Sequence, residues 1–226
     1  MENNIGIDVG ASKIAAGLID PDGKILKEIK IPTEAKKGAE RVVENIIKSV
    51  SLVAGKTLSS KIGIGIAGQV DYRTGIVIFS PNMKGFIDFP LRTVLLSRLG
   101  RKIEVKIDND ANCFALAENR IGEGKSFDNI VGLTIGTGIG SGVICHRQLY
   151  HGRSFASEIG HMKIENHGPK CSCGNKGCLE AYCSGWAIAK RYYEFTKCKK
   201  MPSDIEKEAK NDPKGVAYKI YKEAGK

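Results

Sequence analysis

The same local pattern, a strand followed by a glycine-containing turn and a second strand, occurs twice in this chain of 226 residues. The first copy covers residues 5–19 with its turn at 10–13, and the second covers residues 130–145 with its turn at 136–142. Apolar stretches of strand length flank each turn. This repetition predicts two α/β domains of related design, each opening with a β-hairpin whose turn faces a shared cleft.

The remaining segments alternate between strand-like and helix-like patterns. Residues 4–31 read as an antiparallel meander of three strands, because turn residues separate three short apolar runs. Apolar positions at helical spacing predict a helix over 36–54. Further strands are expected at 61–67 and 103–107, a hairpin at 72–79, and helices at 90–99 and 111–122.

We place the first domain at residues 1–110 and the second at residues 111–226. The residues after 180 read as helices with no further strand set, so the second domain is expected to be incomplete. The chain is therefore expected to be truncated at its C-terminus.

Charge and hydropathy exclude several classes of protein. The net charge is +10, but half of it comes from residues 187–226, where 11 Lys/Arg are mixed with 6 Asp/Glu as on a solvated helix face. This distribution argues against a nucleic-acid partner. No apolar run of 18 residues exists for a membrane span, and no signal-peptide pattern opens the chain, so a cytoplasmic protein is expected.

A cysteine cluster carries the most specific chemistry in the sequence. Cys171, Cys173 and Cys178 follow a C-x-C-x4-C spacing, and His161 lies ten residues upstream. Thiolates together with an imidazole select zinc, and four protein ligands close the coordination sphere. The cluster therefore predicts a structural zinc site.

The first glycine turn follows a carboxylate at a strand end. Asp8 could hold Mg²⁺ directly or through water, and the backbone of Gly10 and Ala11 could face phosphate oxygens. Ser12 and Lys13 add donors to such a site. A plain hairpin turn is the alternative interpretation.

The second turn contains Gly136, Thr137, Gly138 and Gly140. Alternate glycines allow an anion to approach the backbone closely, and the threonine adds a hydroxyl. The pattern resembles G-x-G-x-x-G only loosely and precedes a strand, so a Rossmann site is not expected. As a pair, the two turns predict a phosphate clamp.

A third motif, D-N-D-A-N at 108–112, follows a predicted strand. A carboxylate here could accept a proton from a sugar hydroxyl, while Asn and Asp are also favoured as helix N-caps. Both roles can coexist if one residue of the motif caps the helix and another accepts the proton. Asn82, in a loop, could bind a polyol or could be an ordinary turn residue.

Together these motifs resemble the ROK family of sugar kinases and repressors, over roughly residues 4–195. The most specific part is C-x-C-G-x-x-G-C-L-E after E-I-G-H, and D-N-D-A-N and G-T-G-I-G occur in the right order. The resemblance implies an α/β, bilobal actin/hexokinase-like ATPase fold with two ribonuclease-H-like domains, the second incomplete here. It implies that Asp110 is the catalytic base. It assigns sugar hydroxyls to Asn82, Asn109, Asp110, Glu158, His161 and Glu180.

The resemblance further implies an ATP-dependent kinase that phosphorylates the 6-hydroxyl of glucose or a related hexose in carbohydrate metabolism, with glycolysis as its setting. ATP, Mg²⁺ and a structural Zn²⁺ would be its cofactors, and a homodimer or homotetramer its assembly. A non-catalytic sugar-binding fragment and a sugar-responsive transcription regulator are the alternatives. Four positions depart from the family pattern: Ala11-Ser12 replace Gly-Thr, and Ser141 and Ser157 replace common glycines.

Overall fold

The chain folds into two compact units, which we describe separately. The computed structural model describes residues 3–54, 60–100 and 102–226. The first unit comprises Met1–Gly132 and Gly142–Ala156, and the second comprises Leu133–Ser141 and Ser157–Lys226. The division into domains at 1–110 and 111–226 stays a prediction.

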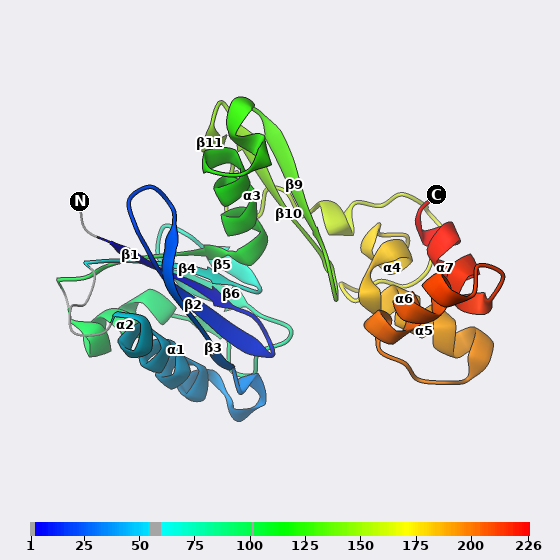
Figure 1. Cartoon of the computed structure of the whole chain (residues 1–226), viewed down its shortest axis with the longest axis horizontal. Helices are drawn as coiled ribbons and strands as arrows, with labels where there is room; N and C mark the ends of the chain where they lie inside the picture. The colour runs from blue at the N-terminus through cyan, green and yellow to red at the C-terminus, as the bar shows by residue number, and fades with distance from the viewer. Residues whose placement is uncertain (1–2, 55–59, 101) are drawn as a thin grey trace. The chain divides into compact units, whose positions relative to one another are not determined.

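The first unit contains most of the strands (Figure 1). Its elements up to the second helix are β1 (Asn4–Val9), β2 (Lys13–Ile19), β3 (Ile25–Pro32), η1 (Ala35–Lys37), α1 (Ala39–Ala54), β4 (Lys61–Ile66), β5 (Gln69–Asp71), β6 (Ile76–Phe79), β7 (Ile87–Phe89) and α2 (Leu91–Leu99). The chain continues through β8 (Glu104–Asn109), α3 (Asp110–Arg120), η2 (Glu123–Ser126), β9 (Ile130–Ile135), β10 (Ile139–Cys145) and β11 (Gln148–Leu149).

The central sheet of this unit has the order β3-β2-β1-β4-β8. β1, β2 and β3 form the predicted antiparallel meander, while β4 pairs parallel with both β1 and β8. Two smaller sheets have the orders β5-β6-β7 and β11-β10-β9. Parallel neighbours place the carboxyl ends of β1, β4 and β8 at one edge of the sheet, and the polar motifs follow β1 and β8.

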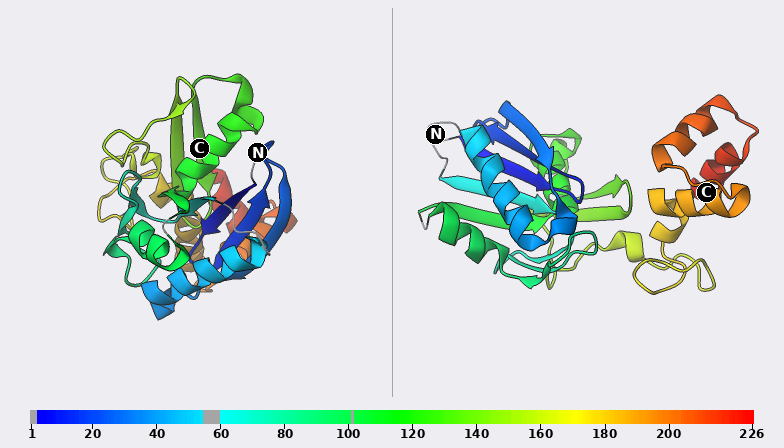
Figure 2. Two further views of the ribbon diagram at one scale, coloured as in Figure 1. Left: turned by 90° about the vertical axis from the view of Figure 1, so that its left-hand side faces the viewer. Right: turned by 90° about the horizontal axis from the view of Figure 1, so that it is seen from below.

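Helix α1 covers one face of this sheet and packs against β2 and β3 (Figure 2). Its buried residues are Ala39, Val42, Val43, Asn45, Ile46, Ser49, Val50 and Val53, most of them at the apolar spacing seen in the sequence. They meet Ile5, Ile7 and Ile64 of the sheet in one apolar core. Removing this much apolar surface from water is the main stabilising contribution to the unit.

The helical elements of the second unit are η3 (Ile159–His161), α4 (Glu180–Cys183), α5 (Gly185–Thr196), α6 (Pro202–Asn211) and α7 (Val216–Ala224). α5, α6 and α7 pack on one another around Ile188, Tyr192, Ile205 and Ile220. A second small core contains Cys171, Cys178 and Ala181.

The predicted α/β class is confirmed, and the predicted strands and helices agree with the described elements to within a few residues. Among the described residues, no helix is long and apolar enough to cross a membrane.

Candidate functional site

The first glycine turn is shaped by a buried threonine that lies far away in the sequence. Thr33 Oγ1 donates to the Gly10 carbonyl at 2.6 Å, and the Thr33 amide donates to the Ser12 carbonyl at 3.1 Å. The Gly10 amide closes the turn by donating to the Lys13 carbonyl at 3.0 Å. Ala11, Ser12 and Lys13 are exposed at its tip, so their backbone can be approached from solvent.

Asp8 and the D-N-D motif lie at the same edge of the central sheet. Asp8 of β1 is in register with Gly65 of β4, and Gly65 is in register with Asp108 of β8. A side chain at Gly65 would contact Asp110 and Cys113, with its Cβ at 3.4 Å from the Asp110 Cα and 3.3 Å from the Cys113 sulfur. Glycine at this position therefore leaves room for the start of α3.

Electrostatics link the two carboxylates. Desolvation raises the pKa of Asp8, the charge of Asp110 raises it further, and Lys13 opposes both effects. Burial likewise raises the pKa of Asp110, although its own backbone amide and that of Ala111 partly offset the shift. Two carboxylates in one partly dehydrated region favour binding of a proton or a cation.

Asn109 is the N-cap of α3. Its Oδ1 accepts hydrogen bonds from the amides of Ala111 at 2.9 Å and Asn112 at 3.2 Å, and its Nδ2 donates to the Gly68 carbonyl at 3.0 Å. The sequence left open which residue of the motif caps the helix, and the structure assigns this to Asn109. Asp110 is then the first helical residue and its carboxylate is half-buried.

Asp108, the other acid of the motif, binds a histidine that the sequence analysis missed. Its Oδ2 lies 2.6 Å from His151 Nε2, and its Oδ1 accepts from Asn112 Nδ2 at 2.9 Å. The His151 ring stacks on Tyr72, with centroids 3.6 Å apart and planes inclined by 12°. No spacing rule connects these residues, because 43 positions separate Asp108 from His151.

Asn82 lies in the loop between β6 and β7 and is exposed. The loop is held by Ser80, whose hydroxyl donates to the Ala67 carbonyl at 2.7 Å, and by the buried side chains of Met83 and Phe86. The amide of Asn82 is thus presented to solvent by an anchored loop.

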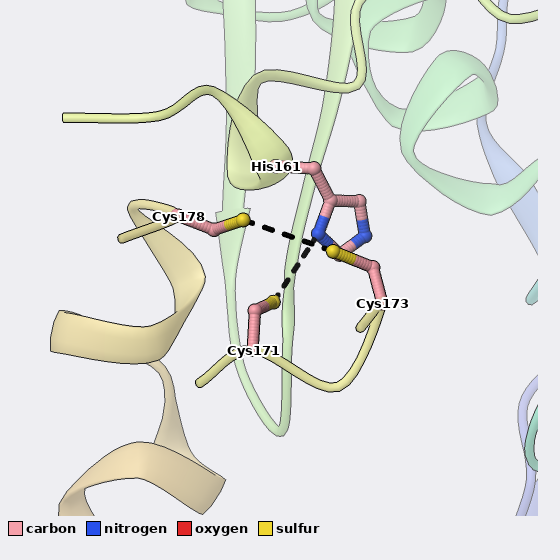
Figure 3. A group of neighbouring side chains, drawn as sticks. All are labelled: His161, Cys171, Cys173 and Cys178. Carbon is pink, nitrogen blue, oxygen red and sulfur yellow. Dashed lines mark hydrogen bonds between the residues drawn. The ribbon is translucent and has the colours of Figure 1, made fainter. Parts of the chain in front are cut away.

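In the second unit, the four predicted metal ligands converge (Figure 3). Their ligand atoms, from His161, Cys171, Cys173 and Cys178, all lie within 4.8 Å of one another. His161 Nδ1 is 3.6 Å from the Cys171 sulfur, and the Cys173 and Cys178 sulfurs are 3.7 Å apart. Tetrahedral zinc with bonds of about 2.3 Å requires sulfurs roughly 3.8 Å apart, so the cluster fits this ion.

The thiols of the cluster also influence one another's protonation. Burial, followed by the neighbouring Cys173 and Cys171, raises the pKa of the Cys178 thiol to about 12. A bound dication reverses such a shift because it stabilises the thiolate. The loop itself depends on Gly177, whose φ is 75° and whose Cβ would lie 1.6 Å from the Glu165 carbonyl oxygen.

The second glycine turn is anchored to the start of α5. The Gly185 amide donates to the Gly136 carbonyl at 2.8 Å, and the Trp186 amide donates to the Thr137 carbonyl at 3.1 Å. Gly136 and Thr137 are exposed, while Gly138 and Gly140 are partly buried. The turn therefore has a fixed backbone and an accessible tip.

Ser141 and Ser157, two of the departures from the family pattern, bind each other. Ser141 Oγ donates to the Ser157 carbonyl, and Ser157 Oγ donates to the Ser141 carbonyl at 3.0 Å. Ser157 has a φ of 76°, a conformation that favours glycine. The reciprocal bonds explain how serine is accommodated there, and they precede the exposed Glu158 and the predicted metal ligand His161.

The chain belongs to the ROK family, whose model matches residues 4–225. It is 43% identical over 185 residues to a glucokinase of Thermotoga maritima, an alignment that covers 81% of this chain and 58% of that protein. A xylose repressor of Bacillus subtilis is 36% identical over 192 residues, covering 83% of this chain and 49% of the repressor.

The fold is shared with a ROK family glucokinase from Streptomyces griseus, solved in complex with glucose and AMPPNP. The TM-score is 0.83 at 32% identity, over 98% of this chain and 75% of that one. The chain spans less than three fifths of the length of the curated glucokinases it matches.

Proposed function

We propose that the protein to which this chain belongs is an ATP-dependent hexose kinase that phosphorylates the 6-hydroxyl of glucose or a related hexose. The observation that carries the proposal is the register of Asp8, Gly65 and Asp108 across three strands, which puts Asp8 close enough to Asp110 for their charges to interact. Phosphoryl transfer requires a site in which a base and a cation-binding carboxylate are held beside a phosphate-binding turn.

Asp110 is the proposed general base. Its raised pKa makes the carboxylate a better proton acceptor than an ordinary aspartate, and α3 fixes its position through the Asn109 cap. Because Asn109 Nδ2 uses one hydrogen for the Gly68 carbonyl, its second hydrogen is available to a sugar hydroxyl. Asp110 would accept the proton of the attacking hydroxyl and keep that oxygen aimed at the phosphoryl group.

The remaining sugar contacts are proposed for Asn82, Glu158, His161 and Glu180. His161 directs Nδ1 to the metal cluster, which leaves Nε2 for a hydroxyl. The proposed zinc ion would brace this segment and supply no step of the reaction.

The proposed phosphate-binding segments are the turns at 10–13 and 136–140. Exposed backbone amides and the side chains of Ser12, Lys13 and Thr137 are suited to the oxygens of ATP. Mg²⁺ held near Asp8 would neutralise charge that develops on the phosphates. A cytoplasmic homodimer or homotetramer, with no nucleic-acid partner, remains our expectation.

A sugar-responsive repressor is a second candidate, because the relatives include the Bacillus subtilis xylose repressor. A non-catalytic sugar-binding fragment is the third. Both would bind a sugar without turnover, whereas a kinase would release ADP.

The test is a coupled ADP-release assay across several hexoses on the full-length protein, with Asp110→Asn and the exposed Asp128→Asn as a matched control. We expect Asp110→Asn to lower kcat by about 10³-fold while sugar binding by calorimetry persists, because a general base contributes on this scale. Asp128→Asn should retain full turnover. Substantial residual turnover in Asp110→Asn would remove this residue from the role of base.

A further inference from the structure

Glu180 connects three segments of the second unit through one buried carboxylate. Its side chain is 7% exposed at the first position of α4. Its Oε1 accepts from the Ser172 hydroxyl at 2.9 Å and from the Trp186 indole N–H at 3.1 Å, and the Cys171 sulfur lies 4.0 Å from the same oxygen. Its Oε2 accepts from the Ile139 amide at 2.9 Å.

Each of these donors belongs to a different functional segment. Ser172 stands between the metal ligands Cys171 and Cys173, in the loop seen in Figure 3. Ile139 lies in the glycine turn at 136–140 and is the first residue of β10. Glu180 is therefore the shortest side-chain link between the metal-binding loop and this turn among the described hydrogen bonds.

The glycine turn is shaped to admit the carboxylate. A Cβ at Gly138 would lie 2.6 Å from Glu180 Oε2, whereas a Cβ at Gly136 would meet nothing within 4 Å. The absence of a side chain at Gly138 thus permits the approach of Glu180. Each carboxylate oxygen offers about two acceptor positions, and the Ile139 amide uses one of those on Oε2, so one remains on this oxygen for a sugar hydroxyl.

We propose that Glu180 is a positioning residue that couples the metal-binding loop to the glycine turn at 136–140, so that loss of the metal ion loosens the turn. The proposal deepens the proposed function, since this turn is the second of the two phosphate-binding turns. The loop holds Ser172, Ser172 holds one oxygen of the carboxylate, and the other oxygen holds the Ile139 amide. When the metal leaves, Glu180 loses the constraint that keeps Oε2 beneath the turn.

A second link runs through backbone alone, from Gly185 and Trp186 to the carbonyls of Gly136 and Thr137. This route does not use the carboxylate. Variants of Glu180 and Ser172 therefore separate the two routes.

The experiment measures amide hydrogen exchange of the segment 136–141 and the emission of Trp186, the only tryptophan in the sequence, on the unliganded chain. Each protein is compared after loading with ZnCl₂ and after removal of the metal by chelation. In the wild type, we expect chelation to lower the protection of the Ile139 amide about tenfold, which corresponds to about 1.4 kcal/mol. The Trp186 emission should shift to longer wavelength as its indole loses the carboxylate.

Glu180→Gln retains one acceptor oxygen, which cannot bind both the Ile139 amide and the donors from Ser172 and Trp186. We therefore expect low protection of the Ile139 amide with zinc present, and little further change on chelation. Ser172→Ala removes the hydroxyl link and leaves only the longer contact of the Cys171 sulfur with Oε1, at 4.0 Å, so it should keep the protection while weakening the response. Glu194→Gln, exposed on α5, is the matched control and should respond as the wild type. Gly138→Ala should loosen the turn as Glu180→Gln does, and Gly136→Ala should not.

The proposal is overturned if chelation removes the metal from the wild type without changing Ile139 exchange. It is also overturned if Glu180→Gln and Ser172→Ala respond to chelation fully, since the backbone route would then carry the coupling. Neither readout requires phosphorylation, so failure of the kinase assignment would leave this test unaffected.

Discussion

The contact between Asp108 and His151 should contribute measurably to the stability of the first unit. The Asp108 Oδ2 and His151 Nε2 atoms are 2.6 Å apart, and the side chains are only 18% and 16% exposed. A hydrogen bond to a charged group contributes about 1.5–3 kcal/mol to the free energy of unfolding. Solvent screening removes little of this, because both partners are largely buried.

A double-mutant cycle isolates the interaction. Asp108→Ala removes the carboxylate, and His151→Phe removes the ring nitrogen while keeping a ring that can stack on Tyr72. Urea unfolding followed by far-UV circular dichroism, at matched m-values, should give a coupling energy of about 1.5–3 kcal/mol. His151→Ala should cost about 0.5–1.5 kcal/mol more than His151→Phe, because it also loses the stacking.

Asp128→Ala is the control, because this aspartate is 69% exposed and 3.7 Å from Arg147. Its effect should stay within about 0.5 kcal/mol. A coupling energy below about 0.5 kcal/mol, the limit of additivity for independent sites, would refute the reasoning. Asp108 and His151 would then be neighbours without a stabilising bond.

Two further predictions concern the acid at the start of α3 and the metal cluster. Burial raises the pKa of Asp110 in the folded state. Protonation of this side chain therefore contributes its full stabilisation below about pH 3.9, the pKa of an aspartate in the unfolded chain, and the contribution is lost as the pH rises through the higher folded pKa. Asp110→Asn should therefore unfold at higher urea than the wild type at pH 7, with a smaller difference near pH 4; a less stable variant at pH 7 would contradict this. Protein purified without chelator should carry one zinc per chain by metal analysis, and Cys173→Ala should lose it while the exposed Cys198→Ala keeps it. Retention of zinc by Cys173→Ala would remove this cysteine from the ligand set.

Local sequence patterns were sufficient to predict the main helices and strands of the first unit. The apolar spacing of α1 matches its buried face, and the turn at Asp20–Gly23 separates β2 from β3 as expected. These predictions succeed because hydrophobic periodicity and turn residues act over a few positions. The ligands of the metal cluster were also predictable, because zinc chemistry imposes its own residue types and spacing.

Contacts between distant residues were not predictable. Thr33 shapes the turn at Gly10, and His151 binds Asp108, yet no periodicity or motif links either pair. Resemblance to the family assigns Glu180 to a sugar hydroxyl. The structure adds its bonds to Ser172, Trp186 and Ile139, which no local rule could supply.

The sequence by itself determined the α/β class, the repeated strand–turn–strand unit, the candidate metal ligands and the family. These depend on short-range periodicity, turn chemistry and ligand spacing, which the order of residues contains directly. Tertiary structure alone decided that Asn109 caps α3, that Ser141 and Ser157 bind each other, and that one buried carboxylate joins the metal loop to a glycine turn. Such arrangements depend on which segments meet in space, and a hydrogen bond is directional over about 3 Å, so only the folded chain defines them.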